Sequence, residues 1–130
     1  MTYLPDLSAH KYGPFREQSG HTVLSVGWLD ASFPYTTGNV EDAILNRLLR
    51  LCRKPVNQTR GYHPCPYCDS YPVTMKVDGN DITLGSAEIR VVGEGDVVYA
   101  APTLMCHYIK EHGYRPPDEF LRAVLRTTVE

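Results

Sequence analysis

The sequence has no long hydrophobic run, no strong excess of charge of either sign and no signal-like segment near its N-terminus. No stretch of its 130 residues approaches the roughly 18 apolar residues that a membrane-spanning helix needs. The formal net charge of −2 gives no general attraction to nucleic acid or to anionic membranes. Residues 1–7 have neither the basic nor the apolar part of a secretory signal. We therefore expect a cytoplasmic protein that makes no membrane contact and keeps its four cysteines reduced.

The sequence also lacks the short motifs of common catalytic sites. It contains no glycine loop for phosphate, no nucleophile elbow and no His-Glu-x-x-His. The string Cys65–Cys68 matches the glutaredoxin active site, but that chemistry requires a helix after the motif, and the residues that follow here predict a strand. The same cysteines match half of the zinc-deaminase pattern, yet the upstream ligand followed two places later by a proton-carrying glutamate is missing. We expect neither reaction.

Turn residues and hydrophobic periodicity predict the secondary structure. Short β-branched runs predict strands, and apolar residues that recur every three to four positions predict helices. Asp78-Gly79 between two such runs is a strong hairpin signal. The expected strands are 22–29, 71–77, 81–84, 87–92 and 96–100. The expected helices are one that Asn39 caps, that begins at Val40 and that Pro55 stops, a second over 102–112 closed by Gly113, and a third opened by Pro116–Glu119.

The order of these elements predicts an α+β fold. Consecutive hairpins imply an antiparallel sheet of about five strands, with the three helices over one face. Residues 1–21 have no periodicity, and we expect them to form an arm packed on the surface. No linker or repeat divides the chain, so residues 1–130 are predicted to be a single zinc-binding α+β domain, stapled by a zinc knuckle.

The segment from His63 to Cys68 carries the strongest chemical signal in the chain. In a Cys-x-x-Cys pair, two thiolates of one tight turn can reach the same tetrahedral zinc ion. Two thiolates do not complete a structural site, so two further ligands are needed. We favour His63, two residues before Cys65, and His107, which lies on a predicted helix. The predicted zinc ligands are therefore His63, Cys65, Cys68 and His107.

Three other residues are alternatives to these ligands. Cys52 falls on the apolar stripe of its predicted helix and is better explained as core. Cys106 is adjacent to His107, and neighbouring helical residues point about 100° apart, so we do not expect both to bind one ion. His112 precedes Gly113 and can simply complement the negative end of its helix.

Several segments of this chain together resemble a family of small bacterial proteins. The resemblance covers most residues from 60 to 121 and rests on the segments 60–68, 85–91, 99–102, 107–108 and 112–117. It implies single-domain cytoplasmic proteins without an assigned reaction, and by analogy an accessory or immunity role beside toxin genes. It assigns no catalytic residue to any position.

We favour a non-enzymatic, zinc-stabilised protein-binding module, with an immunity protein that neutralises a cognate bacterial toxin as its specific form. The missing catalytic set and the nine tyrosines, a residue type favoured at interfaces, support it. The first alternative is a nucleic-acid-binding or regulatory zinc protein, disfavoured by the net charge. The second is a zinc-dependent hydrolase with Glu88 or Glu111 as base. In the first alternative, the cations that would contact nucleic acid are Arg47, Arg50, Arg53, Lys54 and Arg60.

Overall fold

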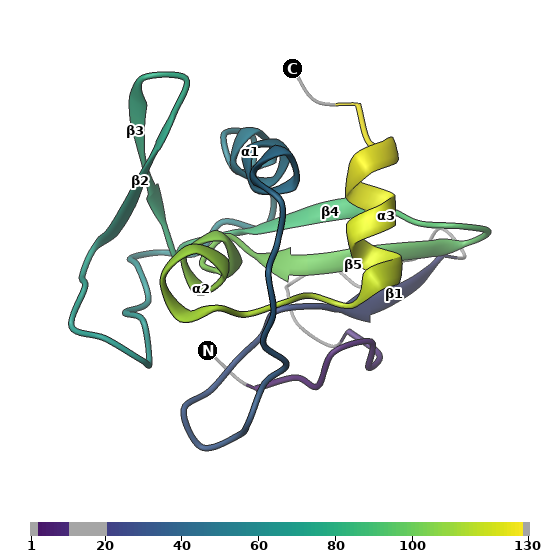
Figure 1. The fold of residues 1–130 in the computed structure, drawn as a ribbon, viewed down its shortest axis with the longest axis horizontal. Coiled ribbons are helices and arrows are strands. Elements are labelled where there is room, and N and C mark those ends of the chain that lie inside the picture. The colour runs from purple at the N-terminus through teal and green to yellow at the C-terminus, as the bar shows by residue number, and fades with distance from the viewer. Residues whose placement is uncertain (1–2, 11–20, 129–130) are drawn as a thin grey trace.

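The structure is a computed structural model that describes residues 3–10 and 21–128 (Figure 1). Five strands form two small sheets, and three helices pack beside them. The first sheet has the order β1-β5-β4, and β2 and β3 form a separate hairpin. The strands are β1 Thr22–Ser25, β2 Val73–Val77, β3 Asn80–Leu84, β4 Glu88–Val92 and β5 Val97–Pro102. The helices are α1 Asp42–Leu51, α2 Met105–His112 and α3 Asp118–Arg126.

The predicted α+β class is confirmed, as are the five strands and three helices, but the strands do not form one antiparallel sheet. β4 pairs with β5 in the expected antiparallel way, whereas β1 pairs with β5 in parallel. This parallel pairing places Thr22 opposite Val97. The two strands are far apart in the sequence, so no turn motif between them could predict the pairing. Gly85, with φ of 106°, turns the chain out of β3, so the first hairpin remains a sheet of its own.

The loop before α1 changes where that helix begins. We predicted that Asn39 caps a helix beginning at Val40, and this is wrong: α1 begins at Asp42 with Glu41 as its N-cap. The carbonyl of Asn39 instead accepts a hydrogen bond of 2.6 Å from Arg115 Nη1. The backbone N–H of Gly38 donates to the carbonyl of Gly113, which ties this loop to the C-terminal end of α2.

The N-terminal arm lies against β1. Leu4 forms an isolated bridge with Trp28, and Ala9 forms one with Leu24. Tyr114 Oη donates a hydrogen bond of 2.8 Å to Asp6 Oδ2, which attaches the arm to the C-terminal half of the chain. The predicted arm is confirmed for residues 3–10, and residues 11–20 lie outside the described residues.

One hydrophobic cluster joins both sheets to the helices. α3 contacts β4 and α1, and α1 also contacts α2 and β2. Leu84 belongs to this cluster, so the end of the β2–β3 hairpin nearest β4 is anchored in the core while its turn projects outward (Figure 1). No helix among the described residues is long and apolar enough to cross a membrane. Fully buried members of the cluster include Leu48, Val91, Leu104, Phe120 and Val124.

Candidate metal centre

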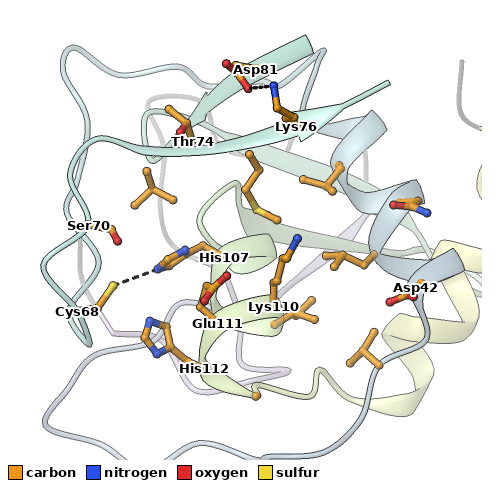
Figure 2. Close-up of a pocket in the computed structure, with 18 of the residues that line it drawn as sticks. Asp42, Cys68, Ser70, Thr74, Lys76, Asp81, His107, Lys110, Glu111 and His112 are labelled. Atoms are coloured by element: carbon orange, nitrogen blue, oxygen red, sulfur yellow. Dashed lines mark hydrogen bonds and ion pairs between the residues drawn. The ribbon is translucent and has the colours of Figure 1, made fainter. Parts of the chain in front are cut away.

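Four potential metal ligands from two distant segments meet beside α2. They are Cys65, Cys68, His107 and His112, and their ligand atoms all lie within 4.8 Å of one another. Cys68 Sγ lies 3.3 Å from His107 Nε2, and Cys65 Sγ lies 3.4 Å from His112 Nε2. Figure 2 shows Cys68, His107 and His112 converging.

These separations suit a tetrahedral metal ion. With a metal–sulfur bond of about 2.3 Å and a metal–nitrogen bond of about 2.0–2.1 Å, a tetrahedral angle places sulfur and nitrogen about 3.6 Å apart. The two observed sulfur–nitrogen distances, 3.3 and 3.4 Å, are within a few tenths of that value. All four donor atoms lie within 4.8 Å of one another, so they are close enough to share one ion after local adjustment.

Local backbone structure presents both cysteines on the same side of a tight turn. Pro66 and Tyr67 form the turn, and the backbone N–H of Tyr67 points at Cys65 Sγ, 3.4 Å away. Before the turn, the backbone N–H of His63 donates to the carbonyl of Gly85. A side chain at Gly85 would lie 2.9 Å from the His63 carbonyl, so only glycine permits this close approach.

Both histidines come from α2, His107 from its first turn and His112 from its last. His112 is the final residue of the helix, and Gly113 ends it in the left-handed conformation with φ of 67°. Tyr35 Oη donates a hydrogen bond of 2.8 Å to the His112 carbonyl. The rings of His107 and His112 lie 5.0 Å apart between centroids. This short helix therefore places two imidazoles, one from each turn, opposite the cysteine turn.

The two thiols occupy different environments. Hydrogen bonds from the side chain and backbone of Ser70, followed by one from His107, lower the pKa of Cys68 to about 6. Burial raises the pKa of Cys65, which is only 5 % exposed. The thiolate is the form that binds metals, so the surroundings of Cys68 favour the metal-binding form before any ion arrives. The centroid of the Tyr67 ring lies 5.5 Å from that of the His112 ring.

The structure brings three of the four predicted ligands together, and His112 joins them in place of His63. His63 precedes the turn, and its backbone N–H donates a hydrogen bond to the carbonyl of Gly85. It is not a member of the cluster of four potential ligands. A sequence signal for His112 was present. His107 and His112 are separated by four residues, which fits the His-x₃₋₅-His spacing that accompanies Cys-x₂₋₄-Cys in structural zinc sites.

The remaining two cysteines lie in the core. Cys52 and Cys106 are buried, with their sulfur atoms 3.7 Å apart. The predicted core position of Cys52 is confirmed. Cys106 faces Cys52 and not the metal cluster, as expected from its position next to His107 on the helix.

A family model for a domain of unknown function, DUF7919, matches residues 2–125. The chain belongs to the DUF7919 family. Neither the curated proteins nor the solved structures gave a match to this chain. The family description names no reaction and no ligand.

A groove of about 1230 Å³ begins at the cluster of four potential metal ligands, called the metal-ligand cluster below (Figure 2). Cys68, His107 and His112 lie at one end of it, β2 forms one side, and α1 and α2 form the other. Glu111 also lines the groove, beside the two histidines. Three residues of the metal-ligand cluster are thus part of the wall of a surface groove.

Glu88 lies outside this groove, in a buried polar network. Asn57 Nδ2 donates to its carboxylate over 2.6 Å, Arg90 Nη2 over 2.7 Å, and His10 Nε2 lies 3.3 Å away. Burial raises the pKa of Glu88, but the hydrogen bonds from His10, Arg90 and Asn57 outweigh it and hold the pKa below its usual value. Since His10 also contacts Ser25, Glu88 serves to attach the arm to the sheet.

Three arginines of α1 and of the turn that follows it interact with other parts of the protein. Arg50 and Arg53 both pair with Asp78 in the hairpin turn, at 3.5 and 3.1 Å. Arg47 Nη1 donates a hydrogen bond of 2.7 Å to the carbonyl of Thr127. These arginines therefore connect α1 and the turn after it to the hairpin and to the C-terminal segment.

Proposed function

We propose that this protein is a non-enzymatic, zinc-stabilised module that binds another protein. The observation that carries the proposal is the cluster of Cys65, Cys68, His107 and His112. Two thiolates and two imidazoles are a donor set typical of structural zinc. Catalytic zinc sites keep one position for water, and four protein ligands leave none.

Zinc bound here would join a loop to a helix. The chain forms no helix or strand between Leu51 and Val73, and the cysteine turn lies in that stretch. Cys65 and His112 are 47 positions apart, so one ion would tie this loop to the C-terminal half of the protein. Metal affinity then contributes directly to the free energy of folding.

The groove beside the metal supports the binding of a protein partner. It combines apolar residues of α1, α2 and β2 with polar side chains, a mixture found in protein interfaces. The internal pairing of the α1 arginines and the net charge of −2 favour a protein over nucleic acid. The specific partner we propose is a bacterial toxin, with this protein as its cytoplasmic immunity protein.

A zinc-dependent hydrolase is the second candidate function, and the position of Glu111 favours it. This carboxylate lines the same groove as three of the four proposed ligands. Hydrolysis would require one ligand to leave the ion so that water can bind and Glu111 can accept its proton. Such a zinc ion would matter more for turnover than for stability.

Chelation separates these two candidates. Tag-free protein should contain one zinc per chain by elemental analysis. A strong chelator should clearly lower the melting temperature and increase hydrogen exchange over residues 58–72 and 101–113, because the ion links these segments. Verified removal of zinc with an unchanged melting curve would contradict a structural site and would favour the hydrolase.

The toxin hypothesis has its own test. Proteins encoded beside the gene should be expressed alone and together with this protein in a common bacterial host. Rescue of growth, with formation of a complex by the purified pair, is the expected result. The Glu111→Gln variant is the matched control: it should rescue as well as the wild type if the activity is binding, and should fail if rescue depends on hydrolysis.

A further inference from the structure

One edge of the β2–β3 hairpin is open, and it faces the groove. Pro72, Val73, Thr74, Met75 and Lys76 are consecutive, and all five line the groove. Alternate residues of a strand point to opposite faces, so five in succession can border one space only if the strand presents its edge to it. Among the described residues, β2 pairs with β3 alone.

The register identifies which backbone groups point outward from this edge. Asp78 and Gly79, with φ of 50° and 83°, form a two-residue turn that closes on the pair Val77–Asn80. In such a hairpin the closing pair is hydrogen-bonded, and hydrogen-bonded pairs alternate with non-hydrogen-bonded ones. Thr74 opposite Thr83 is therefore a non-hydrogen-bonded pair, as is Lys76 opposite Asp81. The N–H and C=O groups of Thr74 and Lys76 face away from β3, toward the groove.

Helices face this edge across the groove. Leu45 of α1 and Met75 of β2 contribute half-buried apolar side chains, and Leu49 of α1 and Ile109 of α2, which are 5 and 8 % exposed, also line the groove. A free strand edge opposite a helix is the arrangement in which domains of the PDZ and PTB type bind extended peptides. β2 has five residues, and at about 3.3 Å per residue it can align a peptide segment of similar length.

The charges along the groove restrict the peptide that fits. Lys76 is paired with Asp81 at 3.1 Å, whereas Lys110 makes no ion pair within residues 3–10 and 21–128. Figure 2 shows the Lys110 side chain pointing across the groove toward the hairpin. Asp42 lies toward one end of the groove and Glu111 beside the metal-ligand cluster. An acidic side chain is therefore favoured near Lys110 and disfavoured at both ends.

We propose that this groove binds an extended segment of the partner protein, which adds to the free edge of β2 as a third strand and places an acidic side chain opposite Lys110. This inference rests on the proposed function, because it specifies how the protein-binding module takes its partner. Backbone hydrogen bonds to Thr74 and Lys76 supply affinity, and the apolar residues of α1 and α2 receive alternate side chains of the peptide.

A matched pair of proline substitutions tests the strand addition. The Thr74→Pro substitution removes an N–H from the edge that faces the groove, and Thr83→Pro removes the equivalent N–H from the opposite edge of the hairpin. Neither N–H takes part in the β2–β3 ladder, so both variants should keep it. The probe is a library of random peptides displayed on phage, selected on the zinc-loaded full chain, and the best peptide is then synthesised for calorimetry.

We expect enriched peptides to alternate apolar residues around one acid. Thr74→Pro should weaken binding about tenfold or more, and Thr83→Pro should leave it unchanged. The Lys110→Glu substitution should weaken binding by a similar factor, and a peptide with lysine in place of its acid should restore it.

Three results would overturn the inference. They are a failure to enrich any peptide, an equal effect of the two proline variants, and an unchanged preference for acid in Lys110→Glu. Zinc content and melting temperature, measured on the same samples, report separately on the metal site. A zinc-loaded, folded protein that binds its partner elsewhere would therefore overturn strand addition and leave the proposed function intact.

Discussion

Replacing His112 by alanine is the sharpest test of the metal centre, because His63 offers a matched control in the same chain. His112 lies in the cluster of four ligand atoms, whereas His63 precedes the cysteine turn and is not part of it. Both histidines are half-buried. His112 belongs to the proposed ligand set, and His63 is only two residues before Cys65 in the sequence. The structure predicts that His112→Ala loses the zinc and that His63→Ala keeps it.

The expected loss of stability follows from the loop that the metal closes. Cys65 and His112 are 47 positions apart. In the chain-entropy model, a link that closes a loop of about 50 residues stabilises the folded state by about 4 kcal/mol. In a domain of this size, each 1 kcal/mol changes the melting temperature by about 3–4 °C. His112→Ala should therefore lower it by on the order of 10–15 °C, and His63→Ala should cost about 1 kcal/mol or less.

The assay combines elemental analysis with thermal unfolding of tag-free protein, with and without a chelator. Wild type and His63→Ala should contain one zinc per chain and lose stability on chelation. His112→Ala should contain little zinc and should already melt where chelated wild type melts. A His112→Ala protein that keeps its zinc and its melting temperature would refute the ligand assignment, as would loss of zinc in His63→Ala alone.

Further substitutions test the rest of the site and the core. Cys68→Ser should abolish zinc retention in elemental analysis. Cys52→Ala should keep the zinc and lower the free energy of unfolding by about 1 kcal/mol in urea titrations, because its sulfur packs only against the core and Cys106. Glu88→Gln should flatten the pH dependence of stability. The hydrogen bonds that lower the Glu88 pKa stabilise the fold above the unfolded pKa of about 4.3 and are lost as the pH falls through the lower folded value. Urea unfolding from neutral to acidic pH measures this effect, and equal slopes in variant and wild type would contradict it.

Features determined by neighbouring residues could be predicted from the sequence. Asp78-Gly79 predicted the first hairpin because both residues tolerate the positive φ that a two-residue turn needs, and the structure has them at 50° and 83°. Gly113 was predicted to end its helix for the same reason. In each case the conformation depends on a few adjacent residues, so tertiary contacts had little opportunity to change it.

Features determined by distant residues were not predictable in this way. The parallel pairing of β1 with β5 depends on contacts between segments far apart in the sequence. Asn39 is a good helix cap by type, but the hydrogen bond from Arg115 holds it in the preceding loop. His112 also had a local explanation, as a residue that complements the negative end of its helix. Its spacing from His107, which also suits a pair of zinc ligands, was therefore not used.

The metal centre and the groove are joined by a single helix, which has a consequence for how they act. His107 and His112 of α2 belong to the cluster, while Ile109 and Lys110, between them in sequence, line the groove. A change in the position of α2 therefore alters the metal ligands and the wall opposite β2 at once. If zinc favours the position of α2 that admits a strand, then a bound strand must raise the affinity for zinc by the same factor, because coupling between two binding sites is reciprocal. A structural ion in this place would thus determine the shape of the binding surface as well as the stability of the fold.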